Sequence, residues 1–368
     1  MRTGIADLPL HYGRAPRWLF EKMTKLSRAI IEVIVCEYGP EEFLKRISDP
    51  FWFQAFGSIL GFDWHSSGVT TTVCGAMKEG TKDIAFELGL FFCGGKGGTS
   101  RKTPKEIEKI GEKIGKDPKD LIYASRMSAK IDNTCVQDGY NLYHHMFIFT
   151  KDLKWAVVQQ GMNLTPLTPS LSHKGRGLIR NFKTARRYHW LSLNLNSFVC
   201  EPHTAVCCDI TQPCLNMVAR ESEESRKVVT EISKDKPEKI LKETEMVLQM
   251  PQRHPVLKID INPKYFHKVL LKTYESPPED FEHLLQIEGI GPKTLRALAL
   301  ISDLIYGAKP SFRDPARYSF AHGGKDGFPY PVDRETYNSS ISFLESAIRR
   351  AKIGETDRLK ALRKLKFL

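Results

Sequence analysis

The sequence predicts an α+β protein, in which a mixed α/β N-terminal part with a β-hairpin precedes an all-helical C-terminal part with a helix–hairpin–helix. Three observations support this. The apolar runs 144–150 and 154–162 are joined by the short KDL stretch, which is typical of a β-hairpin. From residue 213 onward the chain is mainly helical in its apolar spacing. Within that part, IEGIGPKTLRALAL (287–300) places two glycines between two helical segments.

The elements of the N-terminal part follow from local patterns. Residues 15–47 carry apolar side chains at helical spacing, with Pro16 near a helix start. The run VTTTVCGAM (69–77) predicts a strand. The stretch FFCGGKGGTSRKTP leads through a glycine-rich loop into a helix that Thr103 is expected to cap. Residues 122–138 then predict a helix just before the hairpin.

The domain organisation is predicted from changes in composition. Residues 1–212 form the mixed part, which is the expected catalytic domain, and residues 213–368 form the helical, nucleic-acid-binding domain. The Pro/Ser/Gly-rich segment 164–182 interrupts two structured stretches and resembles repeat-derived peptides that interrupt bacterial reading frames. We interpret it as a solvated inserted loop without function. Residues 215–250 predict helices, with a break near 234–239.

Composition limits the classes of partner and compartment. Lys and Arg number 55 against 43 Asp and Glu, a net charge of +12, which favours a polyanionic partner. Nucleic acid is the usual one, and we expect DNA rather than RNA. A membrane partner is not expected, because the sequence has no apolar run long enough to span one and no apolar export signal at its start. Eight cysteines without a CxxC pair indicate reduced thiols and a cytoplasmic location.

The glycine-rich stretch at 289–294 predicts a site for a nucleic-acid backbone. Glycines at 289 and 291 permit a tight turn around Ile290, and the amides of the following helix can bind one phosphate. A helical hairpin used only for packing is the alternative. The loop GGKGGTSRKT offers a second phosphate cradle, although a flexible glycine turn explains it equally well. The predicted nucleic-acid contacts are Gly289, Gly291, Lys293, Thr294, Lys96, Arg101 and Lys325.

Residues 280–340 resemble the helix–hairpin–helix of the endonuclease III-like DNA glycosylases. The resemblance rests on GIGPKT and on the downstream PYPVD. It implies that Lys293 is a nucleophile for the sugar carbon and that Asp333 assists it. The gap between these two residues is longer here, and no iron–sulfur cysteine set follows. The alternative is that Lys293 only contacts phosphate and that Asp333 caps the next helix.

Several stretches of the N-terminal part concentrate groups that carry chemistry. Hydrolysis of a phosphodiester commonly uses carboxylates and histidines on Mg²⁺ or Mn²⁺, with a nearby lysine stabilising charge. The expected metal ligands are Asp132, Asp138 and His145. The hairpin has Gln160 near the position where metal nucleases of this type carry Glu, which is a departure from their pattern. The predicted catalytic residues are Asp63, His65, Lys130, Asp132, Asp138, His145 and Gln160.

Nearly the whole chain resembles an uncharacterised family of archaeal and thermophile-type proteins, catalogued only as a domain of unknown function. The resemblance is carried by LPLHYGRAPRWLF, GGKGGTSRKTP, AKIDNTCVQDGYNLYHH, RRYHW and SFAHGGKDGFPYPVD, and it implies no activity. From the residues, the leading hypothesis is a metal-dependent nuclease that acts on DNA in repair. A glycosylase or abasic-site lyase using Lys293, and a non-catalytic nucleic-acid-binding factor, are the alternatives.

Overall fold

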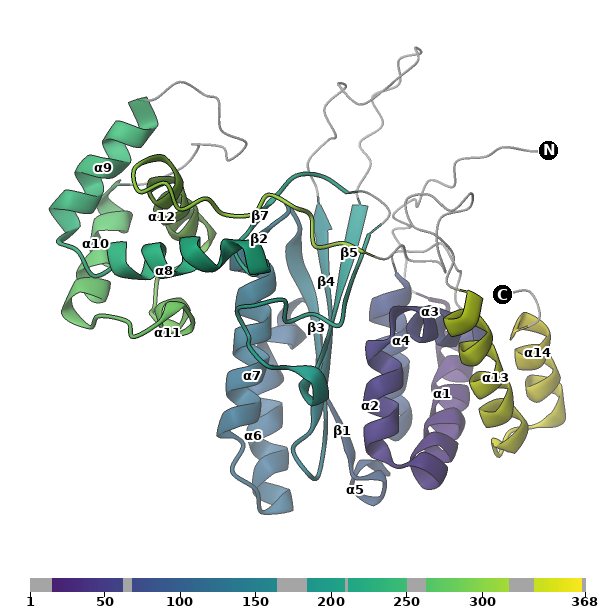
Figure 1. Cartoon of the computed structure of the whole chain (residues 1–368). Coiled ribbons are helices and arrows are strands. Elements are labelled where there is room, and N and C mark those ends of the chain that lie inside the picture. Colours follow the sequence, from purple (N-terminus) through teal and green to yellow (C-terminus); the bar gives the residue numbers. More distant parts are fainter. Residues whose placement is uncertain are drawn as a thin grey trace, which may run out of the picture.

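A computed structural model describes residues 15–61, 68–163, 184–208, 211–249, 263–317 and 334–365. The architecture is α+β, as predicted: helices cover both faces of a central antiparallel sheet, and a helical part extends from one side of it (Figure 1). Some predicted features lie outside the described residues, namely Asp63, His65, Lys325, Asp333 and the insertion 164–182.

The central sheet has five strands in the order β1-β3-β4-β5-β6, and each pairs with its neighbours in the antiparallel sense. The predicted hairpin is confirmed as β3 and β4. A bulge at Tyr143 shifts the register between these two strands. A short second sheet pairs β2 with β7. The strands are β1 (Leu90–Lys96), β2 (Val136–Gln137), β3 (Asn141–Thr150), β4 (Trp155–Asn163), β5 (Thr184–Leu191), β6 (Ala205–Cys207) and β7 (Leu215–Asn216).

Helices cover both faces of the sheet, so that the side chains of its central strands are buried on both sides. We call the side covered by α6 and α7 the α7 face, and the side covered by α2 and α4 the α2 face. Strand alternation sends Phe147 and Phe149 of β3 into the core of the α7 face. Met146 and Ile148 enter the core of the α2 face. A polar residue on either face of these strands is therefore buried.

The helices of the α2 face come from the start of the chain. Asp49 caps α3, because its side chain accepts hydrogen bonds from the amides of Phe51 and Trp52. The predicted strand at 69–77 is wrong, since these residues form α4, which packs between α1 and β1. No helix in the described part of the chain is long and apolar enough to cross a membrane. The helices are α1 (Arg17–Tyr38), α2 (Pro40–Ser48), α3 (Pro50–Leu60), α4 (Val69–Thr81) and α5 (Ala85–Leu88).

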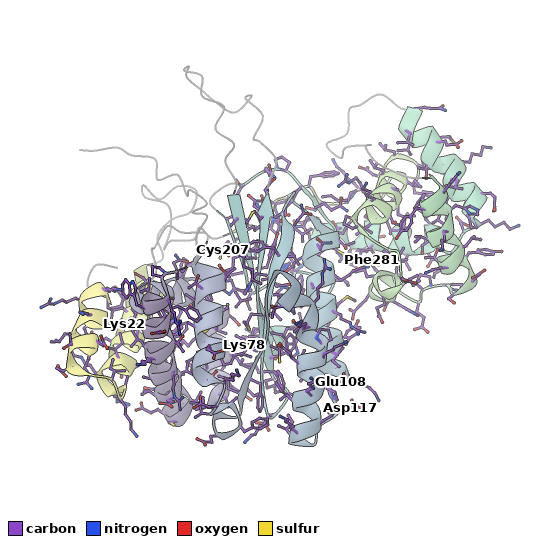
Figure 2. All side chains as sticks on the ribbon, turned by 180° about the vertical axis from the view of Figure 1, so that it is seen from behind. Lys22, Lys78, Glu108, Asp117, Cys207 and Phe281 are labelled. Carbon is purple, nitrogen blue, oxygen red and sulfur yellow. The ribbon has the colours of Figure 1, made fainter. Side chains whose placement is uncertain are left out.

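The helices of the α7 face follow the glycine-rich loop. Thr103 does not cap α6 as predicted, because it is buried and its hydroxyl donates to the Ser100 carbonyl. Lys78 of α4, labelled in Figure 2, reaches around the sheet edge to Glu106 of α6 at 2.7 Å. The helix predicted over 122–138 ends earlier, in a π turn before β2. The elements are η1 (Gly97–Lys102), α6 (Thr103–Ile114), α7 (Lys119–Lys130) and η2 (Ile131–Cys135).

The helical part contains the predicted helix–hairpin–helix, formed by α11 and α12. The predicted break in the preceding helices lies between Ile232 and Pro237. Residues 215–216 form β7 instead of beginning a helix. The elements of this part are η5 (Arg220–Ser222), α8 (Glu223–Ile232), α9 (Pro237–Gln249), α10 (Pro263–Glu275), α11 (Phe281–Gln286) and α12 (Pro292–Leu304); η4 (Ser192–Asn194) directly follows β5 of the sheet.

Two large apolar clusters organise the molecule. The first runs from the α7 face into the helical part, since it includes Phe147 of the sheet and Leu284 and Leu298 of the hairpin helices. The second lies on the α2 face, and the last two helices, α13 (Arg334–Arg350) and α14 (Glu355–Leu365), complete it. Packing therefore joins the sheet to the hairpin across residue 212, and it places α13 and α14 beside α1 and α3 (Figure 1).

Candidate functional site

Two polar rows cross the sheet at the same level, one on each face. The register aligns neighbouring strands so that polar side chains of β3, β4 and β5 stand side by side. Each face is covered by helices, so the polar groups of both rows are buried. The row on the α7 face contains His145, Gln159 and Tyr188, and the row on the α2 face contains His144, Gln160 and Arg187.

On the α7 face, four side chains form a continuous hydrogen-bonded relay. Ser125 Oγ of α7 lies 2.9 Å from His145 Nε2. His145 Nδ1 lies 2.9 Å from Gln159 Oε1, and Gln159 Nε2 donates to Asp132 Oδ2 at 2.6 Å. His145 and Asp132 are both among the predicted catalytic residues, and Gln159 joins them in the structure. We call this set the Ser125–Asp132 relay.

The direction of each hydrogen bond in the relay follows from its carboxylate end. Gln159 donates its amide nitrogen to Asp132, so its amide oxygen faces His145 and can only accept. His145 therefore carries its proton on Nδ1, and Nε2 is left as an acceptor for the Ser125 hydroxyl. This is the tautomer that a histidine needs to act as a general base toward a serine.

Asp132 is held by three donors at the end of the relay. Trp190 Nε1 donates to Oδ2 at 3.1 Å, and His203 Nε2 lies 2.5 Å from Oδ1. Burial raises the pKa of the Asp132 carboxyl, and His203 and Trp190 oppose that shift. Burial also lowers the pKa of His145 to about 4, which keeps the imidazole neutral at ordinary pH.

Asp138 belongs to a separate cluster on the same face. Its carboxylate accepts from Arg186 at 3.0 Å and from the Tyr188 hydroxyl at 2.7 Å, and Arg186 also binds Asp314 at 2.8 Å. The predicted ligands therefore do not form a metal site as they stand: a guanidinium neutralises Asp138, and both ring nitrogens of His145 are hydrogen-bonded. Within the described ranges, no group of three or more His, Cys, Asp or Glu is placed to hold a metal ion.

A pocket of about 290 Å³ opens onto the serine end of the relay. Ser125, His144, His145 and Gln159 are its buried lining residues, while Arg101 of η1 and Arg126 of α7 are exposed. Ser100 and the start of α6 complete one wall. The pocket therefore combines a serine–histidine pair with two guanidinium groups that suit an anionic substrate.

The remaining predicted catalytic residues lie apart from the relay. Gln160 and its neighbour His144 are on the α2 face, where Gln160 donates to the Tyr143 hydroxyl at 2.5 Å. Neither ring nitrogen of the buried His144 has a hydrogen-bond partner among the described residues. Lys130 ends α7, and burial lowers the pKa of its amine. Gln160 and Lys130 are not among the residues that line the pocket, whereas His144 is.

The glycine-rich loop lies against the hairpin strands. A side chain at Gly94 would place its Cβ 2.2 Å from the His145 carbonyl oxygen, so only glycine permits β1 to approach β3 here. Lys96, at the end of β1, is exposed and stands 5.9 Å above the Tyr143 ring. Arg101 from the same loop reaches the pocket, so one of these two predicted phosphate contacts lies at the candidate site.

The second candidate region is the turn between α11 and α12. Ile290 is fully buried in the turn, as predicted. Gly289 has φ +100°, and a Cβ there would lie 2.6 Å from Val269 of α10, so this glycine is required. Gly291 is in extended backbone and has open space around it. The Thr294 hydroxyl turns inward to the Gly289 carbonyl at 3.3 Å, whereas Lys293 is exposed.

The hairpin is fastened to the sheet part by Gln137. Its amide nitrogen donates to the Pro292 carbonyl at 2.8 Å, and its amide oxygen accepts from Arg296 at 2.8 Å. Tyr123 of α7 also hydrogen-bonds Glu282 of α11. The first turn of α12 therefore has a fixed position relative to α7 and β2.

Sequence reasoning missed the residues that complete the relay and the Asp138 cluster. A serine in the middle of a helix carries no distinguishing pattern, and His203 lies in an irregular segment. The pair Arg186–Arg187 does carry a signal, because two charged residues inside an apolar strand indicate buried partners on both faces. The missed residues are Ser125, Arg186, Tyr188, Trp190 and His203.

The comparisons with known proteins place the chain in a family without giving it an activity. No curated protein and no solved structure matches the chain. A family model described as "Protein of unknown function (DUF763)" matches residues 4–332, which includes the relay, the pocket and the hairpin. The chain therefore belongs to the family of proteins of unknown function DUF763.

Proposed function

We propose that the chain is a nucleic-acid-processing phosphodiesterase that acts on DNA and holds the strand by the turn between α11 and α12. The observation that carries the proposal is this turn. It has a required glycine at 289, open space at Gly291, and the uncapped start of α12 with exposed Lys293. Amides at a helix start, with the helix dipole behind them, bind phosphate without reading the bases.

The charge around the turn supports the same proposal. Tyr265 and Val269 of α10 lie next to Gly289, so α10 flanks the turn. Lys264 and Lys268 of α10 are exposed on the outside of that helix. Glu288 is paired with Lys272 at 2.5 Å and offsets part of this charge. A surface of this kind suits a polyanionic backbone.

Binding is tested by fluorescence anisotropy with labelled single-stranded and duplex DNA and the matching RNA, at several salt concentrations. Lys293→Gln should weaken binding by about 3- to 10-fold for every sequence and lower the salt slope by about one. Gly291→Val should also weaken binding, because its methyl groups would stand over the α12 amides while the fold has room for them. Lys352→Gln, which removes an exposed charge between α13 and α14, is the matched control. Unchanged affinity in both hairpin variants contradicts the proposal.

Cleavage is tested on the same DNA strands with Mg²⁺, with Mn²⁺ and with a chelator. The metal site of Asp132, Asp138 and His145 remains a prediction, and it requires that cleavage be lost in the chelator. The lyase alternative requires covalent trapping of Lys293 on an abasic strand by borohydride. An amine nucleophile is usually activated by burial or by nearby cations, and the exposure of Lys293 does not favour that alternative. Tight binding of DNA without any cleavage would instead support the third alternative, a non-catalytic nucleic-acid-binding factor.

A further inference from the structure

We propose that Ser125 is a nucleophile, activated by His145, for phosphate esters that bind in the pocket between η1, α6, α7 and β3. The proposal assigns a covalent, serine-based centre to the α7 face. Its physiological substrate, a nucleic-acid phosphodiester, rests on the proposed function. The reactivity of Ser125 does not depend on that assignment and is tested without nucleic acid.

The first argument is the orientation of the Ser125 hydroxyl. A serine inside a helix usually donates to a carbonyl one turn back, as Ser128 does to the Ser125 carbonyl at 3.2 Å. Ser125 instead points its hydroxyl at His145 Nε2 at 2.9 Å. Because His145 Nδ1 donates to Gln159, Nε2 is the acceptor, and the serine proton already points at its base.

The second argument is that the relay fixes the base as catalytic triads do. A third group must orient the histidine and favour the imidazolium that forms when the serine proton is transferred. Gln159 orients the His145 ring by a direct hydrogen bond. Asp132 provides the negative charge and acts on His145 through Gln159. His203 and Trp190 hold Asp132 in place from the far side.

The third argument is the substrate class that the pocket favours. Arg101 and Arg126 line it, and neither guanidinium forms an ion pair with any described residue. Arginine forks match the oxygens of a phosphate group. These cations stand beside the buried serine, where a phosphoryl group under attack would carry its charge.

The reaction that follows from this geometry has two balanced steps. Ser125 Oγ forms a bond to phosphorus while its proton moves to His145 Nε2. The bond from phosphorus to the leaving oxygen breaks, its electron pair stays on that oxygen, and His145 returns the proton there. A water then attacks phosphorus, gives its proton to His145, and the Oγ–P bond breaks as Oγ regains a proton. The net result is a diester and water converted to a monoester and an alcohol.

The test uses an alkyl fluorophosphonate, from which attack by an activated serine displaces fluoride. The full chain is incubated with this probe, and the adduct is located by intact mass and peptide mapping. One adduct on Ser125 is expected, absent in Ser125→Ala and slowed at least about 100-fold in His145→Gln. Ser128→Ala, on the same helix, should react at the wild-type rate. No adduct on Ser125, or labelling unaffected by His145→Gln, overturns the proposal.

A second nucleophile at the same position keeps the test informative if Ser125→Ala fails to fold. Ser125→Cys, incubated with iodoacetamide, should be alkylated at residue 125 faster than the same variant that also carries His145→Gln, because the same base takes up the thiol proton. Equal alkylation rates with and without His145→Gln overturn the proposal.

Discussion

The two faces of the sheet bury polar side chains at the same level, but the hydrogen-bond partners of these side chains differ between the faces. On the α7 face, Gln159 donates to the Asp132 carboxylate and Arg186 donates to the Asp138 carboxylate, and His145 is hydrogen-bonded to Gln159. On the α2 face, the partners described for Arg187 are neutral: His189, Gln54 and the Pro50 carbonyl. There the His144 ring is buried with no hydrogen-bond partner among the described residues.

This difference assigns different roles to adjacent residues of one strand. His145 is fixed by bonds to both of its nitrogens, as a residue with a chemical task must be. The His144 ring loses its hydrogen bonds to water on burial and gains none in the described structure, which lowers the free energy of unfolding. A count of buried polar groups is therefore a weak indicator of a functional region. It is more informative whether each of these groups has hydrogen-bond partners.

The largest expected effect is on the α7 face, at Asp138. Asp138→Asn should lower the free energy of unfolding by about 3–5 kcal/mol, because it removes a charge that neutralises the buried Arg186. Urea unfolding measures the loss. Glu345→Gln, which breaks an exposed pair with Arg349, should cost no more than about 1 kcal/mol. A stable Asp138→Asn protein that binds DNA but has lost turnover would instead support the catalytic role that the sequence predicts.

The next prediction compares the two histidines directly. At pH 7.5, His145→Leu should lower the free energy of unfolding by about 2–3 kcal/mol, since Ser125 and Gln159 both lose a partner. His144→Leu should raise it by about 1–2 kcal/mol, since it removes buried nitrogens that have no partner in the described structure. Thermal and urea unfolding of both variants make the measurement. If both variants lowered the free energy of unfolding by the same amount, the two histidines would have to make equally favourable hydrogen bonds.

A third prediction is a dependence of stability on pH. In the unfolded chain a histidine takes up its proton near pH 6.5, but burial lowers the pKa of His144 to about 3 and that of His145 to about 4. Between these values the unfolded state binds more protons, so stability falls as the pH falls below about 6.5. His144 alone should account for about 2 kcal/mol at pH 5.

The control for this prediction is His144→Leu, studied by urea unfolding at pH 7.5 and pH 5. Wild type should lose more stability between the two values than the variant, by about 2 kcal/mol. Burial is the main cause of the low pKa of His144, and His145 and Lys96 lower it further. An identical loss in both proteins would show that His144 is protonated in the fold at pH 5, and hence that it is not sealed from water.

Local sequence patterns correctly predicted those elements whose conformation is determined by residues close together in the chain. The β3–β4 hairpin and the α11–α12 turn were both predicted, because alternation and the glycine spacing act within a few residues. The run at 69–77 was wrong as a strand, since packing between α1 and β1 overrides the local preference of its threonines and valines. The same holds for Thr103, which is buried instead of capping α6.

The candidate site was predicted only in part, because its geometry depends on contacts between distant segments. Asp132 and His145 were selected by residue type, but the residue that joins them to a pocket, Ser125, comes from the middle of α7. Asp138 was grouped with them on sequence proximity, and the fold pairs it with Arg186, which lies beyond the segment 164–183. No spacing rule predicts a partner of that kind.

The position of the last two helices has a consequence for synthesis of the chain. Leu344 and Ile348 of α13 belong to the same apolar cluster as Ile30 of α1 and Trp52 of α3. About 300 residues separate α1 from α13, which a ribosome working at roughly 5–20 residues per second covers in about 15–60 s. During that interval the apolar surfaces that await α13 and α14 are exposed on the nascent chain. We expect this side of the molecule to be the one that chaperones cover, while the turn between α11 and α12 can already fold, because Gln137 and Val269, which hold it, precede it in the chain.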